Sequence, residues 1–338
     1  MVLAALLLVA VASSIVVAAA PGKPAATKGE IAFRRFFDVE RTTGAIFLIN
    51  PDGSGARQLT HPPQGGLDDQ PNWAPDGSRI LFSREPAGDD GRLGTFWTVK
   101  PDGSDPELQS STCPGGPATC LENEQRHEPL YSPDGSKIAY GWAAGQVSNF
   151  GQIQFSDVWV MNADGTDPRR LTSFTADAPY SQDVGPGAWS PDGTQLVIAR
   201  SMSPVGEPAG GLALFIINAD GSGLRQLTPW ALRAGSRADW SSDGRRIVFR
   251  TIPPNDEPGG DIYTIRPNGR GLRQLTHFPP DGVLGELGFS PDAKSIVFTR
   301  GGESRDMFVM RANGTHIEQI TQTELSENWP DWGPGVSR

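Results

Sequence analysis

Seven side chains able to bind or react stand just ahead of an aromatic residue that recurs along the chain. Carboxylates gathered in one place can hold a divalent cation such as Ca2+ or act as an acid–base pair. An arginine and a tryptophan are common anchors for a partner. We predict a binding site at the mouth of a central channel, formed by His127, Glu128, Arg237, Asp239, Glu286, Trp329 and Asp331.

A divalent cation is the alternative ligand for this site, and the acidic members could equally form a solvated rim. We assign no metal-ligating residue and predict no cofactor. Three acidic pairs add to the negative charge of the same face: Asp68–Asp69, Asp89–Asp90 and Asp256–Glu257.

Motifs of known catalytic chemistry are missing from the sequence. It contains neither a G-x-S-x-G nucleophile elbow nor an H-E-x-x-H zinc signature. His61 and His277 occupy equivalent places in a repeat and His316 falls in a tight turn, which leaves His127 to consider. We therefore predict no catalytic residue and a protein that is not an enzyme, although carboxylates from separate loops can still meet in a fold.

The two cysteines, Cys113 and Cys120, lie in the Gly- and Pro-rich segment TCPGGPATC. A close pair of this kind in an exported protein is typical of a disulfide. Closing so short a loop stabilises the fold by about 2–3 kcal/mol in the chain-entropy model. A metal site would need a second Cys/His pair, and a redox pair is usually C-x-x-C. We predict a disulfide between Cys113 and Cys120.

Two alternating phrases explain where these side chains lie. The first is an aromatic residue, a Pro-Asp-Gly turn and alternating apolar residues, as in WSPDGTQLVIA. The second is an aromatic and an aliphatic residue two apart, an Asp-Gly turn and Leu-Thr, as in ALFIINADGSGLRQLT. Asp-Gly favours hairpins because Gly accepts positive φ and Asp caps its own turn. Each phrase predicts one hairpin, and the aromatics of the first phrase are Trp73, Tyr131, Trp189, Trp240, Phe289 and Trp332.

Four short strands that recur roughly every 50 residues are typical of propeller blades. We predict an all-β, six-bladed β-propeller with four-stranded antiparallel blades over residues 29–338. The segment from Ile31 fits a second strand without a first, and Trp332 fits a first strand with no successor. We expect these two strands to pair and close the ring. Gln109 replaces the repeated Leu in one unit, so we expect a frayed or short outer strand there.

The consensus W-S-P-D-G-x-x-I-x-F followed by D-I-Y-x-M-N-x-D-G-x-x-x-R-x-L-T resembles the WD40-like repeat of TolB-type six-bladed β-propellers. The resemblance covers about residues 29 to 335 and is specific for a fold rather than an activity. It implies a cell-envelope partner. TolB proteins carry an α/β domain ahead of the propeller, and prolyl-oligopeptidase-type enzymes carry a hydrolase domain behind theirs; we expect neither here.

Some similar propellers are sugar lyases that use a divalent metal. This resemblance implies an alternative function, a carbohydrate-active lyase or hydrolase with a metal or carboxylate site in the channel. Our main prediction remains a non-enzymatic binding module that uses its channel mouth and the face bearing the long loops. Long irregular loops on a rigid scaffold are the usual place for binding, and the tight Asp-Gly turns all fall on the opposite face.

The N-terminus and the overall charge indicate where the protein acts. Residues 1–20 form an apolar stretch ending in VVAAA, which predicts a signal peptide or, if uncleaved, an anchor; residues 21–28 form a linker. A net charge of -10 repels nucleic acid and anionic lipid. We predict an exported monomer, periplasmic, cell-envelope or secreted. Its partner would be an envelope or extracellular protein or a cell-wall component, with membrane contact only through an uncleaved N-terminal segment.

Overall fold

The computed structural model describes residues 29–85, 94–110, 125–144, 155–173, 180–204, 211–235, 237–254 and 257–335. The predicted signal peptide or anchor, the linker, and the Cys113–Cys120 disulfide all lie outside these residues. Within the described ranges, no helix has the length and apolar character needed to cross a membrane.

The described strands form two eight-stranded and two four-stranded hydrogen-bonded sheets. The first sheet has the order β24-β1-β2-β4-β5-β6-β7, with β3 beside β2. Its strands are β1 (Ile31–Phe36), β2 (Gly44–Ile49), β3 (Arg57–Gln58), β4 (Leu67–Trp73), β5 (Ile80–Glu85), β6 (Thr95–Val99), β7 (Glu107–Ser110) and β24 (Glu327–Trp332).

The second eight-stranded sheet has the order β15-β14-β13-β12-β10-β9-β8, with β11 beside β10. Its strands are β8 (Gln125–Tyr131), β9 (Lys137–Ala144), β10 (Phe155–Asn162), β11 (Arg169–Arg170), β12 (Tyr180–Trp189), β13 (Gln195–Pro204), β14 (Gly211–Asn218) and β15 (Arg225–Gln226). The 3-10 helix η2 (Trp230–Leu232) follows it.

The two four-stranded sheets follow in chain order. One contains β16 (Asp239–Trp240), β17 (Ile247–Arg250), β18 (Ile262–Ile265) and β19 (Arg273–Gln274). The other contains β20 (Val283–Phe289), β21 (Ser295–Gly301), β22 (Arg305–Arg311) and β23 (Glu318–Gln319).

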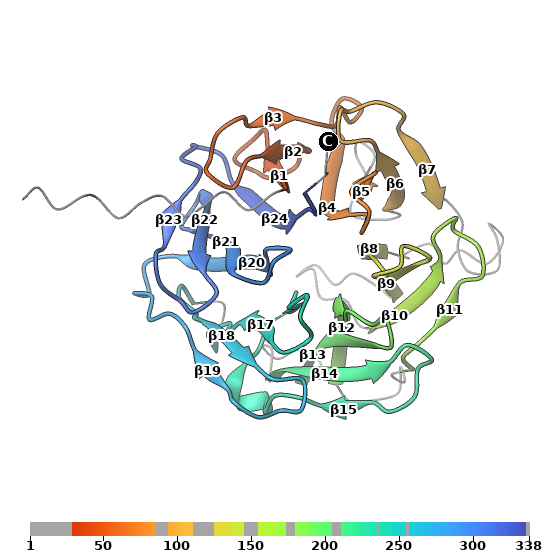
Figure 1. Ribbon diagram of the computed structural model, residues 1–338, viewed down its shortest axis with the longest axis vertical. Helices are drawn as coiled ribbons and strands as arrows, with labels where there is room; N and C mark the ends of the chain where they lie inside the picture. Colours follow the sequence, from red (N-terminus) through yellow and green to blue (C-terminus); the bar gives the residue numbers. More distant parts are fainter. Residues whose placement is uncertain are drawn as a thin grey trace, which may run out of the picture.

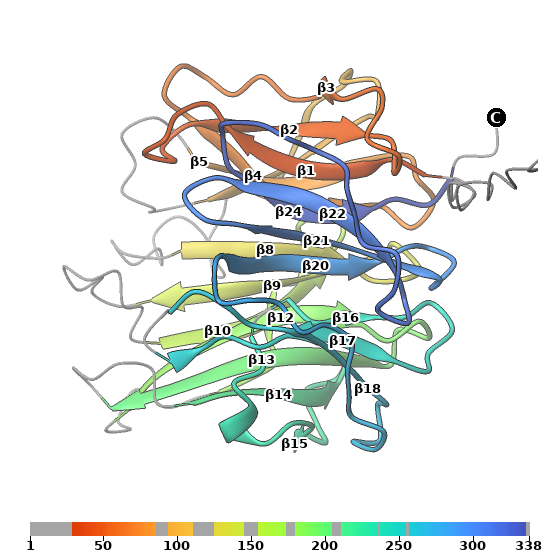
Figure 2. The same cartoon turned by 90° about the vertical axis from the view of Figure 1, so that its left-hand side faces the viewer.

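Antiparallel pairing runs in sets of four strands, and one parallel pair joins two sets in each larger sheet, Gly44 with Leu67 and Phe155 with Gln182. Figure 1 shows these sets arranged around a central axis, and Figure 2 shows their strands running between two faces of the ring. The predicted all-β propeller with four-stranded antiparallel blades is confirmed. β1 pairs with β24, and Ile31 lies opposite Trp332.

The core lies between neighbouring sets of strands rather than inside any one of them. Val197 of β13 and Ile216 of β14, for example, pack against Trp240 and Phe249 of the next set. Equivalent buried clusters lie between each set of the described strands and the next around the axis. Each sheet therefore has two buried faces, which is why middle strands such as β2 (GAIFLI) are nearly continuous apolar runs.

The repeated Leu-Thr pair has two structural roles. The leucine is buried, with Leu227 only 7% exposed. The threonine hydroxyl accepts the backbone N–H of the third strand, as Thr276 does from Ile262 at 2.9 Å. Equivalent bonds at Thr60, Thr172, Thr228 and Thr321 satisfy amides beyond the end of the two-residue outer strands.

The turn glycines allow neighbouring sets to approach closely. A Cβ on Gly314 would lie 2.4 Å from the carbonyl oxygen of Leu275, and one on Gly53 would lie 2.6 Å from that of Ile320. Both residues also have positive φ, 89° and 82°. Glycine is therefore needed here for its conformation and for the missing Cβ.

The expectation of a short outer strand at Gln109 is wrong. β7 has four residues, whereas β3, β11, β15, β19 and β23 each have two. A bulge in its pairing with β6 lies between Phe96 and Trp97, and Leu108 is 46% exposed. Without the buried Leu-Thr ending, the strand continues along its neighbour instead of turning away from it.

Candidate functional site

The predicted site residues occupy fixed positions ahead of the aromatic residue of each inner strand. We call the third residue before the aromatic the bulge position and the residue directly before it the tie position. The bulge positions are Gln70, Glu128, Pro186, Arg237, Glu286 and Trp329. Four of these were predicted from the sequence. Gln70 and Pro186 were not, although counting back from Trp73 and Trp189 would have found them.

The bulge position is conformationally strained. The pairing of β4, β8, β12 and β20 with their neighbours shifts register around it. Residues at four of these positions have left-handed φ: Gln70 (55°), Glu128 (55°), Arg237 (61°) and Trp329 (59°). Non-glycine residues rarely adopt this conformation, which costs about 1–3 kcal/mol each and is concentrated at functional sites.

Polar side chains at the tie position connect neighbouring inner strands. Asp331 Oδ2 accepts the N–H of Trp73 at 2.6 Å, and Asp239 Oδ2 accepts the N–H of Phe289 at 2.6 Å. Asn72 forms the same bond to β8 at 2.8 Å. These bonds hold adjacent inner strands together around the axis.

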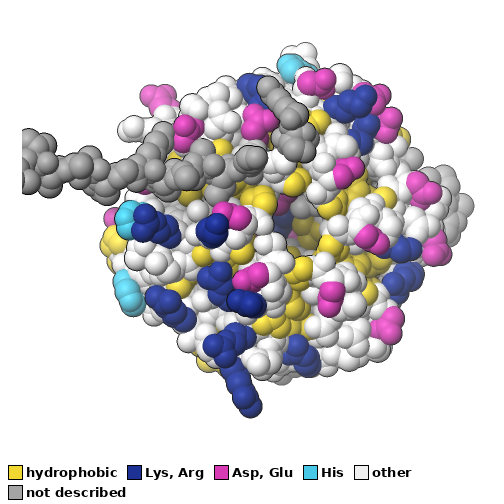
Figure 3. Space-filling model, in the orientation of Figure 1, with side chains coloured by type: hydrophobic (Ala, Val, Ile, Leu, Met, Phe, Trp, Pro, Cys, Tyr) yellow, Lys and Arg dark blue, Asp and Glu magenta, His cyan; other side chains and the backbone are white. Residues whose placement is uncertain are grey.

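The other three inner strands have apolar or small tie residues, and a cavity lies where the polar ties are missing. Its volume is about 170 Å³, and Leu130, Ala188 and Gly288 all line it. Figure 3 shows a hollow at the centre of the ring with hydrophobic side chains around its rim. The charged and aromatic residues of the lining are Tyr131, Trp189, Arg237, Asp239, Glu286, Trp329 and Asp331.

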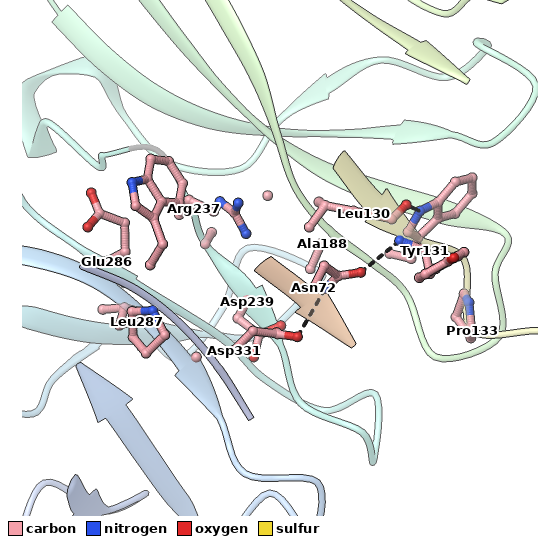
Figure 4. A pocket seen from close by; sticks show the side chains of 16 residues that line it. Asn72, Leu130, Tyr131, Pro133, Ala188, Arg237, Asp239, Glu286, Leu287 and Asp331 are labelled. Atoms are coloured by element: carbon pink, nitrogen blue, oxygen red, sulfur yellow. Dashed lines mark hydrogen bonds between the residues drawn. The ribbon is translucent and has the colours of Figure 1, made fainter. Parts of the chain in front are cut away.

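Arg237 is the main cation of this cavity. It is only 9% exposed, and its Cζ lies 4.3 Å from the centre of the Trp329 ring. Its Nε and Nη2 atoms are buried and have no hydrogen-bond partner among the described residues. In Figure 4 the guanidinium points toward the side of the cavity formed by Leu130 and Ala188.

The two tie aspartates are hard to ionise. Burial raises the pKa of Asp239 from 3.8 to about 7, and the Asp331 carboxylate adds to the rise, while the Phe289 amide opposes it. Burial raises the pKa of Asp331 to about 6. Both side chains face the cavity but are otherwise enclosed by protein, so the cavity is less anionic near neutral pH than its composition implies.

Glu286 behaves differently from the aspartates. Burial opposes its ionisation, but Arg250 and Arg305 outweigh burial and lower its pKa below the ordinary value. Its Oε1 lies 3.5 Å from Nη2 of Arg250, and in Figure 4 the carboxylate points away from the Arg237 guanidinium. Glu286 therefore lines the cavity as an already paired carboxylate.

Five of the seven predicted residues thus line one cavity, and two do not. His127 packs on β9, where a Cβ on Gly141 would lie 2.2 Å from the imidazole Cε1. The Glu128 carboxylate lies against Gly185 of β12, where a Cβ would be 2.6 Å from Oε2. The missing side chains of these two glycines make room for His127 and Glu128, which lie outside the cavity lining.

The arginines that balance the inner carboxylates were not predicted from the sequence. Arg34 bonds to Asp69, and Arg250 pairs with Glu286. Each follows directly after the aromatic of a second strand, in IAFRR and IVFR. An arginine directly after this aromatic is a pattern that the sequence contains. It was not recognised because other units have an arginine one residue later.

The acidic pairs do not gather into a cation site within the described part of the chain. Asp68 is bonded to Arg84 at 2.6 Å, and Asp69 is bonded to Arg34. Among the described residues, no group of three or more His, Cys, Asp or Glu side chains is placed to hold a metal. Asp89, Asp90 and Asp256 lie outside those residues.

The cavity extends toward the face of the tight turns, since Pro133 of a Ser-Pro-Asp-Gly turn lines it. The sequence favoured the opposite face, with the long connections, as the binding face. Much of those connections lies outside the described residues, so that preference remains a prediction.

No family model matches the chain. Dipeptidyl-peptidase 5 of Porphyromonas endodontalis is 33% identical over 155 residues, 44% of this chain and 21% of that protein. The protein TolB homolog of Chlorobium luteolum is 26% identical over 289 residues, 85% of this chain and 56% of that protein. This chain thus spans only part of both relatives.

Comparison with solved structures identifies the fold. The crystal structure of TolB from Acinetobacter baumannii matches 90% of this chain and 67% of that chain, with a TM-score of 0.65 and 17% sequence identity. The identity is low, so the match shows a shared fold and no more. With the four-stranded sets around a central axis and the alternating hairpins described above, it shows that the chain is a TolB-like β-propeller.

Proposed function

We propose that this protein is a non-enzymatic, exported binding module that takes an envelope or extracellular protein, or a cell-wall component, at the mouth of its central channel. The observation that carries the proposal is the convergence of Arg237, Trp329 and Asp331 on one cavity. Two of them have strained left-handed backbone, and Arg237 leaves polar atoms unsatisfied. The left-handed backbone recurs at the bulge position, while unsatisfied buried polar atoms are a feature of sites that bind a ligand.

The similarity to TolB homologs supports a partner in the cell envelope. A Tol-Pal system protein TolB from Anaeromyxobacter dehalogenans also matches 42% of this chain. The proposed location is periplasmic, cell-envelope or secreted, and the proposed partner is an envelope or extracellular component.

Crosslinked affinity capture from the producing cell's envelope, read by mass spectrometry, tests the binding function. The variant is Trp329→Ala, which opens the cavity wall without placing a charge in the core. Leu272→Ala, at a leucine 46% exposed on the outer edge, is the matched control. A partner captured by the native chain and the control but lost by Trp329→Ala supports the proposal. A partner captured equally by all three contradicts it, provided that thermal unfolding shows all three folded.

We also propose six blades, with the ring closed by the two ends of residues 29–338. The β1–β24 pairing supports closure, as does the packing of Ile31 and Phe33 on Val297 and Met307. Removing residues 327–338 should abolish cooperative unfolding, because β1 and the β20–β23 set would both lose a neighbour. Retained cooperativity would argue against closure by these strands.

The remaining parts of the organisation are proposals with simple tests. Residues 1–20 act as a signal peptide or anchor and 21–28 as a linker, and the intact mass of the exported protein distinguishes cleavage from retention. Cys113 and Cys120 form a disulfide, which alkylation before and after reduction would reveal. The protein is a monomer, which light scattering of the purified chain would test.

A carbohydrate-active lyase or hydrolase is the second candidate. It needs a metal or a pair of carboxylates in the channel, and Asp239 and Asp331 are such a pair, with pKa values raised to about 7 and about 6. Both carboxylates already hold backbone amides, which explains them structurally. Activity on uronic-acid polymers that a chelator or Asp239→Asn abolishes would favour the enzyme. Inactivity over a broad glycan panel would eliminate it.

A further inference from the structure

Arg237 is a buried cation that interacts electrostatically with Asp69, Asp239 and Asp331 but forms an ion pair with none of these described carboxylates. Other arginines near the inner carboxylates are paired, such as Arg34 with Asp69 and Arg250 with Glu286. Arg237 forms no ion pair within the described chain, and its Nε and Nη2 have no hydrogen-bond partner. A desolvated guanidinium without acceptors is unfavourable by several kcal/mol unless a partner supplies them.

The carboxylates closest to Arg237 are committed elsewhere. Asp239 Oδ1 and Oδ2 accept the N–H groups of Trp240 and Phe289 at 2.7 and 2.6 Å. Asp331 Oδ2 accepts the N–H of Trp73 at 2.6 Å. Turning the Asp239 carboxylate toward Arg237 would break a bond that holds adjacent inner strands together, and Asp331 holds its own inter-strand bond through Oδ2. In the structure, neither side chain supplies the acceptor that Nε and Nη2 of Arg237 lack.

The surroundings of Arg237 select the shape of that acceptor. Trp329 covers one face of the guanidinium, so an acceptor would have to reach the buried Nε and Nη2 atoms along the edge of the planar N–H fork. A carboxylate matches this fork with two parallel hydrogen bonds. The side of the cavity that the fork faces includes Leu130 and Ala188, which suits the carbon atoms attached to a carboxylate. About 170 Å³ is ample for such a group, since a single water needs only about 10–15 Å³.

We propose that Arg237, covered by Trp329, binds a carboxylate of a peptide segment of the partner, either an acidic side chain or the C-terminal carboxylate. This inference rests on the proposed binding function and specifies its chemistry. Asp239, Asp331, Glu286 and Tyr131 are the other titratable groups of the cavity, and the buried Asp69, which is bonded to Arg34, also interacts with Arg237. Glu286 is neutralised by Arg250, and the two aspartates hold protons below about pH 6, so the site accepts an anion most readily in mildly acidic solution.

The test uses the full chain labelled with 5-fluorotryptophan and 19F NMR at about pH 5.5. The Trp329 resonance is assigned from its disappearance in Trp329→Phe. The probes are three pairs that differ in charge but hardly in shape: acetate and acetamide, N-acetylalanine and its amide, and N-acetyl-aspartic acid amide and N-acetylasparagine amide. The second pair represents a C-terminus and the third an acidic side chain.

We expect at least one carboxylate of the two peptide-derived pairs to shift the Trp329 resonance saturably, while its amide counterpart does not. Arg237→Met should abolish the shift. Arg237→Lys should weaken binding roughly tenfold, because the charge remains and the fork is lost. Arg266→Met, at an exposed arginine outside the cavity, should leave binding unchanged. The comparison of probes on the native chain needs no variant, so it holds even if Arg237→Met fails to fold.

Three outcomes would overturn the inference. The first is that no carboxylate shifts the Trp329 resonance, and the second is that the shift survives in Arg237→Met. The third is that galacturonate shifts the resonance when the peptide-derived carboxylates do not, which would assign the site to a sugar acid. The result is independent of the envelope capture. If a carboxylate binds but no partner is captured, only the proposed binding function is contradicted. If a partner is captured but no carboxylate binds, only the proposed role of Arg237 is contradicted.

Discussion

Asp239 makes the stability of this protein depend on pH in an unusual direction. Its pKa is raised from 3.8 to about 7 in the fold, chiefly by burial. Between these two values the folded chain holds the proton and the unfolded chain releases it. A raised carboxyl pKa therefore stabilises the fold at low pH, and this contribution is lost as the pH rises through the interval.

The size of the effect follows from the width of the interval. One pH unit corresponds to about 1.4 kcal/mol, so the interval from 3.8 to about 7 corresponds to at most about 4 kcal/mol of unfolding free energy. Asp331 contributes to the rise and titrates in the same cavity, so the two carboxyls share the slope. Asp239→Asn removes one ionisable group and keeps an oxygen for the Phe289 amide.

The assay is urea unfolding of the native chain and of Asp239→Asn at about pH 4 and about pH 7.5. The stability of the native chain relative to the variant should fall by up to about 4 kcal/mol between these pH values. Asp134→Asn is the control, because the Ser132 hydroxyl and the Ser136 groups lower the pKa of Asp134 to about 2. Its interval lies below the pH window, so its difference from the native chain should stay flat. A flat or rising difference for Asp239→Asn would refute the reasoning.

Three further substitutions test the repeat itself. Leu227→Ala should lower the unfolding free energy by about 2–4 kcal/mol in denaturant titration, whereas Leu224→Ala, 42% exposed, should change it little. Thr276→Val should cost about 1–3 kcal/mol and speed hydrogen exchange of the third-strand amide that its hydroxyl satisfies; unchanged exchange would contradict the assigned bond. Gly314→Ala should destabilise by about 1–3 kcal/mol through positive φ and a backbone clash, while Gly302→Ala, with open space around it, should not; equal thermal midpoints would reject the close-approach argument.

Much of the fold could be predicted from the sequence because each hairpin is specified by residues within the hairpin itself. Asp-Gly turns, alternating apolar residues and the aromatic two residues ahead of an aliphatic all act within one or two strands. The turn aspartates show this locality, since Asp76 accepts the amide and hydroxyl of Ser78 two residues later. The length of the outer strand β7 was predicted wrongly. It depends on which side chain is buried at the end of the strand, and the absence of one Leu from the sequence does not reveal that.

The site was predictable in part. Arg237, Asp239, Glu286, Trp329 and Asp331 were selected because they precede the inner-strand aromatics, and all five line one cavity. Their individual roles were not predictable. Whether a carboxylate is paired, as in Glu286, or holds a backbone amide, as in Asp239, depends on groups 36 and 50 residues away in the sequence.

The sequence by itself determined the alternating hairpins, their aromatic register and the likeness to TolB-type propellers, because turn chemistry and strand periodicity are local. Only the tertiary structure decided that Leu130, Ala188 and Gly288 leave space where other inner strands are tied by polar side chains. It also decided that Arg237 lies buried beside that space without a partner. Both facts arise where six inner strands from distant parts of the chain meet, and contacts around that axis are set by the packing of whole sheets.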